Sequence, residues 1–111
     1  MRHDLAITYM NRGVALTDLG RLKDALADCN TCIGLEEGLV QREGRRELAG
    51  QLAWGYARQA GLLLRIGRRE EACQRAREAV SILQSELSRT GRADLRGVLE
   101  LAEEVARDAG G

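Results

Sequence analysis

The sequence predicts a single all-α domain built from repeated helical hairpins. Its 111 residues include no proline, one Trp and two Tyr, while the helix-favouring residues Leu, Ala, Arg and Glu are abundant. The chain also matches itself when it is shifted by 47 residues, a shift that places Leu5 on Leu52 and Gly20 on Gly67. A fixed period of this order is typical of stacked supersecondary units.

Four glycines between amphipathic runs predict the ends of the helices. Gly20, Gly44, Gly67 and Gly91 stand at matching places, where a residue that adopts positive φ can close a helix. They divide the chain into five expected helices, at residues 3–19, 22–43, 46–66, 69–89 and 93–108. Because the connections are only a few residues long, neighbouring helices are expected to be antiparallel and to form hairpins.

Apolar residues recur with helical spacing along these segments. The stripe of helix 3–19 comprises Leu5, Tyr9, Leu16 and Leu19. The stripe of helix 69–89 comprises Ala72, Cys73, Ala76, Ala79, Val80, Leu83 and Leu87. Small residues at matching positions predict close helix contacts, because larger side chains would overpack them by about 1 to 3 kcal/mol. These positions are Gly13, Ala25, Ala60 and Ala72.

One domain is expected to span residues 1–111, with a first hairpin at 3–43, a second at 46–89 and a capping helix at 93–108. One face of the capping helix is apolar and the other is charged, so it can close one end of the stack. The first unit lacks a counterpart of the segment 44–47 and has no cap. We therefore expect either a homodimer that forms through the uncapped N-terminal end or a fragment of a longer repeat array.

The pattern of residue types within each unit resembles the tetratricopeptide repeat family. The matching positions of the first unit are Tyr9, Gly13, Leu16, Gly20, Leu22, Ala25 and Cys32. Those of the second unit are Tyr56, Ala60, Leu63, Gly67, Ala72 and Ala79. Arg69 departs from the apolar residue that usually follows the turn. The resemblance implies a solenoid of helical hairpins.

The period of 47 residues exceeds the usual length of about 34 residues. The additional residues lie between Leu35 and Leu48 and again between Ile82 and Leu95, so the hairpins are expected to be long. This resembles a long bacterial variety of the repeat, often attached to signalling NTPase or caspase-like peptidase domains. The family's proline near the end of the second helix is absent, which fits a second helix that continues.

The resemblance implies a concave face that is lined by the first helix of each unit and binds a peptide or a partner helix. The candidate binding residues are Met10, Asn11, Val14, Asp18, Trp54, Arg58 and Arg65. The same face includes Ile7, Thr17, Ala57, Gly61, Leu101, Glu104 and Val105. Met10 and Trp54 would be apolar anchors, and the two arginines would supply charge contacts. An alternative for Trp54 is packing between adjacent hairpins.

Some family members hold a chaperone's C-terminal carboxylate with Lys and Asn. Met10 and Val14 stand at those positions here and cannot donate charge-assisted hydrogen bonds. The sequence therefore does not predict a carboxylate clamp of that kind.

The sequence predicts no catalytic site, no metal site and no cofactor. Cys29 and Cys32 form a C-x-x-C, but both fall within a helix at packing positions, and a structural zinc site normally needs four ligands. His3 is the only histidine and lies in the first predicted turn, where it is a poor candidate for a catalytic base. Three cysteines, an odd number, are typical of reduced thiols in the cytoplasm.

Charge and hydropathy exclude further classes. The 17 basic and 17 acidic residues give a net charge of zero, which does not favour a dedicated nucleic-acid surface. No transmembrane helix or secretory signal is expected. A basic stretch at residues 58–77 keeps a nucleic-acid-binding helical repeat open as one alternative. Another is a regulatory segment of a larger signalling protein. The leading prediction is a noncatalytic interaction scaffold.

Overall fold

The computed structural model describes residues 12–13, 15–42, 44 and 48–110, and this part of the chain consists of helices joined by short turns, with no strand. Residues 12–13 and 15–18 are helical. The elements that follow are α2 (Leu22–Glu37), the π-helical segment η1 (Gly38–Arg42), α3 (Ala49–Ile66), α4 (Arg69–Thr90) and α5 (Leu95–Gly110). The predicted all-α class is confirmed, and these bounds agree with the expected helices to within about three residues.

The predicted glycine positions end the helices through the left-handed conformation. At the end of α3, Gly67 has a φ of 101°, and its N–H donates to the carbonyls of Leu63 and Leu64. The N–H of Arg68 also donates to the carbonyl of Leu63, at 2.8 Å. Among the described residues, positive φ occurs only at Gly20, Gly44, Gly67 and Gly91. A residue with a Cβ would be strained at each of these turns.

The second helix of each pair is long, as expected. After Glu37, the chain continues from α2 into η1 without leaving the helical region. The 22 residues of α4 extend well past Gln84, so the helix is about 33 Å long at 1.5 Å per residue. Both observations follow from the absence of a proline that would interrupt these helices.

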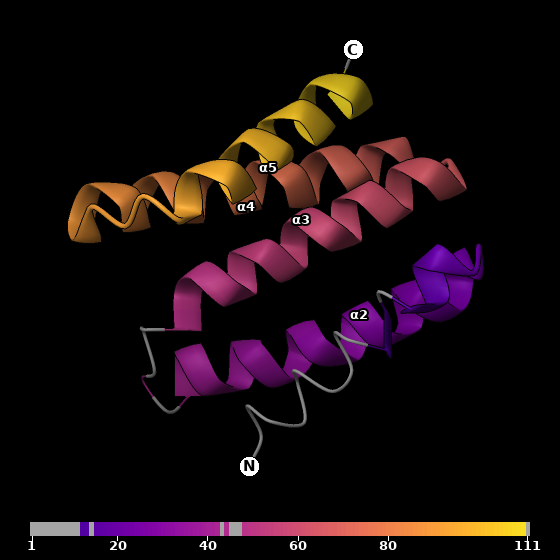
Figure 1. Cartoon of the computed structure of the whole chain (residues 1–111), viewed down its shortest axis with the longest axis horizontal. Helices are drawn as coiled ribbons and strands as arrows, with labels where there is room; N and C mark the ends of the chain where they lie inside the picture. Colours follow the sequence, from indigo (N-terminus) through magenta and orange to yellow (C-terminus); the bar gives the residue numbers. More distant parts are fainter. Residues whose placement is uncertain (1–11, 14, 43, 45–47, 111) are drawn as a thin grey trace.

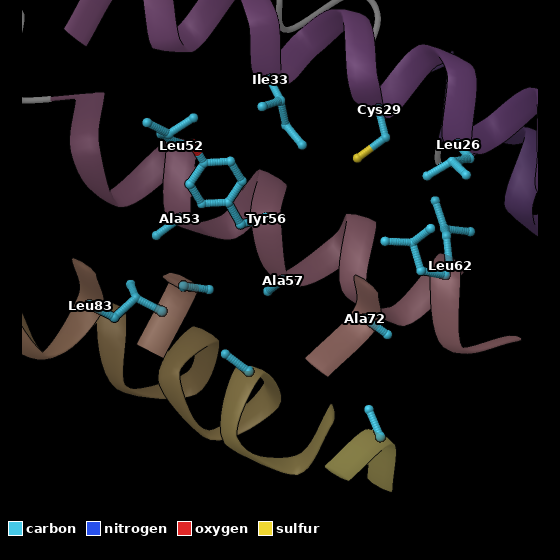
Figure 2. Packing of buried hydrophobic residues seen from close by; sticks show 14 of the residues in the cluster. Leu26, Cys29, Ile33, Leu52, Ala53, Tyr56, Ala57, Leu62, Ala72 and Leu83 are labelled. Atoms are coloured by element: carbon cyan, nitrogen blue, oxygen red, sulfur yellow. The ribbon is translucent and has the colours of Figure 1, made fainter. Parts of the chain in front are cut away.

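Successive helices run in opposite directions, and α3 lies in the middle of the molecule (Figure 1). It packs against α2 on one side and against α4 and α5 on the other. Figure 2 shows side chains of α2, including Ile33 and Cys29, that point toward Leu52 and Tyr56 of α3. The contacts of α3 with α4 and α5 are built largely from fully buried alanines, namely Ala53, Ala57, Ala60, Ala72, Ala76, Ala79 and Ala102. Short side chains allow these helices to approach closely.

The predicted close contacts include Ala25, Ala60 and Ala72, which have no exposed surface. A Cβ at the buried Gly13 would lie 3.5 Å from the carbonyl oxygen of Ala25, which is ordinary contact. Contact is tighter at Gly50, where a Cβ would lie 2.9 Å from Leu95 Cδ2. The start of α3 and the start of α5 therefore pack closely here, and a side chain at Gly50 would require Leu95 to shift.

The exposure of Leu19 differs from the sequence expectation. It was expected on the apolar stripe of the first helix, but its side chain is 73% exposed. The helix ends at Asp18, and Leu19 belongs to the turn that leads into Gly20. Leaving the helix removes Leu19 from the 3.6-residue periodicity that would have buried it.

The last helix, α5, is amphipathic. Leu95, Ala102 and Val105 are buried, and Glu100, Glu104, Arg107 and Asp108 are exposed. None of the described helices combines the length and the apolar character that crossing a membrane requires.

Candidate functional site

A groove runs along one face of α3 and is bounded by α5 and by the first helical stretch. The side chains and backbone that line it belong to Thr17, Ala57, Arg58, Gly61, Leu62, Arg65, Leu101 and Val105. Its volume is about 190 Å³. We refer to this hollow as the groove.

Helical spacing places the groove residues of α3 on a common face. Arg58, Gly61 and Arg65 follow one another at intervals of three and four residues, so they lie above one another along the helix. A Cβ at Gly61 would meet no atom within 4 Å, which leaves the floor of the groove open between the two arginines. The groove therefore has a cation near each end and no side chain at its centre.

Arg58 is half-buried and is held by neighbours from two helices. Its Nη2 lies 3.4 Å from Thr17 Oγ1, and its guanidinium carbon lies 5.5 Å from the centre of the Trp54 ring. The Thr17 hydroxyl donates in turn to the carbonyl of Gly13 at 2.8 Å. The Nε of Arg58 is buried and has no hydrogen-bond acceptor in the described part of the chain. A cation in this position is both fixed and incompletely satisfied.

The expected binding residues are only partly gathered at the groove. Arg58 and Arg65 line it, whereas Asp18 is exposed and is not among the lining residues. Trp54 does not line it either, since its half-buried ring packs against Cys32 of α2 and supports Arg58. Met10, Asn11 and Val14, together with Ile7 of the same expected face, lie outside the residues that the structure describes.

A second hollow, which we call the cleft, lies on the opposite side of α3 between α2 and α4. Its volume is about 230 Å³. It is lined by Leu26, Asn30, Gln59, Leu63, Arg68, Glu71, Gln74, Arg75 and Glu78. Sequence reasoning did not identify this cleft. Two arginines could have indicated it, Arg68 just before α4 and Arg75 within α4. Each is followed three residues later by a glutamate, a spacing that allows an ion pair on a helix.

The arginines of the cleft are paired with carboxylates of the same chain. Arg68 and Glu71 form two hydrogen bonds, at 2.7 and 2.6 Å, and Arg75 donates to Glu78 at 3.1 Å. The guanidinium of Arg75 also lies 4.7 Å from the centre of the Tyr56 ring. The cleft therefore has no net charge from these four groups.

Tyr56 connects the cleft to α2. Its ring is buried, and its hydroxyl donates a hydrogen bond to Glu37. Burial and the neighbouring Glu37 carboxylate both raise the pKa of Tyr56 above its ordinary value. The phenol therefore stays protonated and acts as a structural donor that ties α3 to α2.

The C-x-x-C pair is buried where α2 packs against α3. Cys29 and Cys32 are each 2% exposed, and the Cys29 thiol donates to the carbonyl of Gly55 at 3.5 Å. Burial raises the pKa of Cys29 to about 11 and that of Cys32 to about 12. Thiols in this state are poor nucleophiles and poor metal ligands, because both roles require the thiolate. Within the described part of the chain, no three His, Cys, Asp or Glu side chains are grouped for a metal ion.

The basic stretch at residues 58–77 does not form a single surface. Arg58 and Arg65 line the groove, Arg68 and Arg75 line the cleft, and Arg77 lies beside another hollow along α4. The remaining member, Arg69, donates to the carbonyl of Asp108 at 2.7 Å. The run of arginines is therefore divided among separate environments.

Comparisons of this chain with protein families, with characterised proteins and with solved structures find no significant match in any of the three.

Proposed function

We propose that this chain is a noncatalytic protein-interaction module that binds a peptide or a partner helix in the groove. The observation that carries the proposal is the composition of the groove. Arg58 and Arg65 form no ion pair with the residues that the structure describes, and the adjacent Leu101 is 40% exposed. Arginines without an internal ion pair beside an accessible apolar side chain are typical of protein recognition surfaces.

The helix arrangement supports this proposal. If the helices form tetratricopeptide-like hairpins stacked in order, the first helix of each unit shares one face of the solenoid. Thr17, α3 and α5 would belong to these three first helices, and they jointly line the groove. On this interpretation, α5 caps the stack and the groove is its concave face.

Two features favour protein over nucleic acid and over catalysis. Arg68 and Arg75 are neutralised within the chain, which leaves fewer cations for a phosphate backbone than the sequence alone indicates. Burial keeps the thiols of Cys29 and Cys32 protonated, which makes them poor nucleophiles. Salt-sensitive retention of the chain on a DNA or RNA column would instead support the nucleic-acid alternative.

The test uses two matched glycine substitutions in affinity capture from lysate of the source cells. Gly61→Leu fills the groove floor, whereas Gly34→Leu adds the same side chain to an exposed face of α2, where a Cβ also meets no atom within 4 Å. We expect captured partners, identified by mass spectrometry, to fall at least about tenfold with Gly61→Leu and to be retained with Gly34→Leu. Circular dichroism should show unchanged helix content for both. Equal capture by the two variants would reject the groove as the binding site.

We further propose that the chain acts in the cytoplasm, since Cys29, Cys32 and Cys73 are all free thiols. Assembly through the N-terminal end, as a homodimer or within a longer array, stays a prediction. Light scattering at high protein concentration is its test, and a stable monomer would reject the dimer. A regulatory role within a larger signalling protein would appear as a fused coding sequence next to this one.

A further inference from the structure

We propose that the groove binds an amphipathic α-helix with two acidic side chains seven residues apart and an apolar side chain between them. This inference rests on the proposed function and adds the chemistry and the conformation of the partner. It is carried by the charge of the groove, by the spacing of its cations and by the size of the hollow between them.

The described residues that line the groove carry only positive charge. Among them, Arg58 and Arg65 are the only charged residues. Neither of them forms an ion pair within the described part of the chain. The arginines that do so there are Arg12, Arg21, Arg68, Arg75, Arg89 and Arg92. Arg58 is half-buried, lines the groove and has no carboxylate partner in the described part of the chain, so a carboxylate from a partner can form a charge-assisted hydrogen bond with its guanidinium. Arg65 is exposed and offers a second such contact.

The spacing of the cations selects a helical partner. Arg58 and Arg65 are seven residues apart on α3, or about 10.5 Å along the helix axis. In a partner helix that lies along α3, residues seven apart have the same separation and face the same side. In an extended peptide, side chains on one face are about 6.8 or 13.6 Å apart, so neither spacing matches.

The hollow between the cations accepts one apolar side chain. Its volume of about 190 Å³ exceeds the roughly 150 Å³ of an apolar cavity that holds benzene, so a side chain such as leucine can enter it. Leu101 and Val105 form the wall on α5, and the floor at Gly61 is open. A partner residue three or four positions after the first acid would point into this hollow.

The proposal is tested by selecting displayed peptides against the intact 111-residue chain. The library consists of alanine-rich helices of about sixteen residues, in which one face is randomised among Glu, Lys, Leu and Gln. We expect the enriched peptides to carry Glu at two positions seven apart with Leu between them. Selection against Arg65→Glu should replace only one of the two acids with Lys, because Arg58 still requires the other.

A matched control and a blocking variant separate the possible outcomes. Arg77→Glu makes the same charge change on an exposed residue of α4 and should leave the selected pattern unchanged. Gly61→Leu should reduce the affinity of the selected helices at least about tenfold. Peptides that are blocked by Gly61→Leu but lack the paired acids would overturn this inference and leave the proposed function intact. An absence of enriched peptides would overturn this inference, and peptides insensitive to Gly61→Leu would overturn both. Helix content from circular dichroism verifies that each variant is folded.

Discussion

The groove and the cleft lie on opposite sides of α3 and use the same residue types differently. Each is lined by two arginines and has a volume near 200 Å³. In the cleft, Arg68 and Arg75 are paired with glutamates that follow them by three residues. In the groove, Arg58 and Arg65 have no carboxylate partner within the described part of the chain.

The difference follows from the composition of the two helices. α3 contains Arg58 and Arg65 and no acidic residue, so neither arginine has a local partner. α4 contains Glu71, Glu78 and Glu86 at helical spacing from arginines. Charges that are satisfied within the chain contribute to the fold, whereas fixed charges without a partner are available for binding. On the proposed function, Arg68 and Arg75 stabilise the fold, whereas Arg58 and Arg65 are the candidates for binding.

The largest expected effect concerns the thiols that are buried between α2 and α3, near Arg58. Above about pH 8.5, the unfolded chain loses thiol protons that the folded chain retains until about pH 11 at Cys29 and about pH 12 at Cys32. The stabilisation is therefore complete below pH 8.5 and is lost as the pH rises through these folded-state values. We expect the free energy of unfolding to fall by roughly 2 to 4 kcal/mol between pH 8 and pH 10.

Urea unfolding at several pH values checks this prediction. The double variant Cys29→Ala and Cys32→Ala should show a much weaker dependence on pH over the same range, whatever its stability at pH 7. Parallel curves for the variant and the parent protein would contradict the assignment to these thiols. Arg58 lowers the pKa of both thiols through its charge, so Arg58→Met should extend the alkaline loss to higher pH without changing its slope between pH 8 and pH 10.

A smaller effect contrasts the two sets of arginines directly. Arg75→Met removes the ion pair with Glu78 and the contact with the Tyr56 ring, so it should destabilise the fold by about 1 kcal/mol. Arg58→Met removes the favourable contact of the guanidinium with the Trp54 ring. It also removes the cost of holding a half-buried cation that has no carboxylate partner in the described part of the chain. These effects oppose each other, and we expect a change below about 0.5 kcal/mol.

Binding should show the opposite order. A helix selected on the groove should bind Arg58→Met at least about tenfold more weakly and should bind Arg75→Met as tightly as the parent protein. Urea unfolding and titration calorimetry measure the two properties on the same samples. Equal losses of affinity in both variants would remove the distinction between the groove and the cleft.

Local sequence patterns were sufficient to predict the helices and some of the residues that line the groove. Glycine spacing located the helix ends because a left-handed residue is required at each of them. The register of the resemblance placed Arg58 and Arg65 on one face of α3 because that face depends only on helical periodicity.

Contacts between helices could not be predicted from local sequence patterns. Arg12 and Asp28 are sixteen residues apart, yet Nε of Arg12 lies 2.6 Å from Oδ2 of Asp28 across two helices. The hydrogen bond from Arg12 lowers the pKa of Asp28, although no local spacing indicates this pair. Similarly, Trp54 was a candidate anchor, and only the position of α2 shows that its ring packs against Cys32.

The smallest expected effect is at the base of the cleft. Gln59 is 9% exposed, and its Nε2 donates to Asn30 Oδ1 at 2.6 Å, while its Oε1 is buried without a donor in the described part of the chain. Gln59→Met loses one hydrogen bond and also removes one unsatisfied acceptor. Because Asn30 is exposed and can bind water instead, we expect urea unfolding to show a change below about 0.5 kcal/mol. A loss of unfolding free energy well above 1 kcal/mol would contradict this expectation. It would mean that the Gln59 amide, and not only the paired charges of the cleft, contributes to holding the helices that line the cleft together.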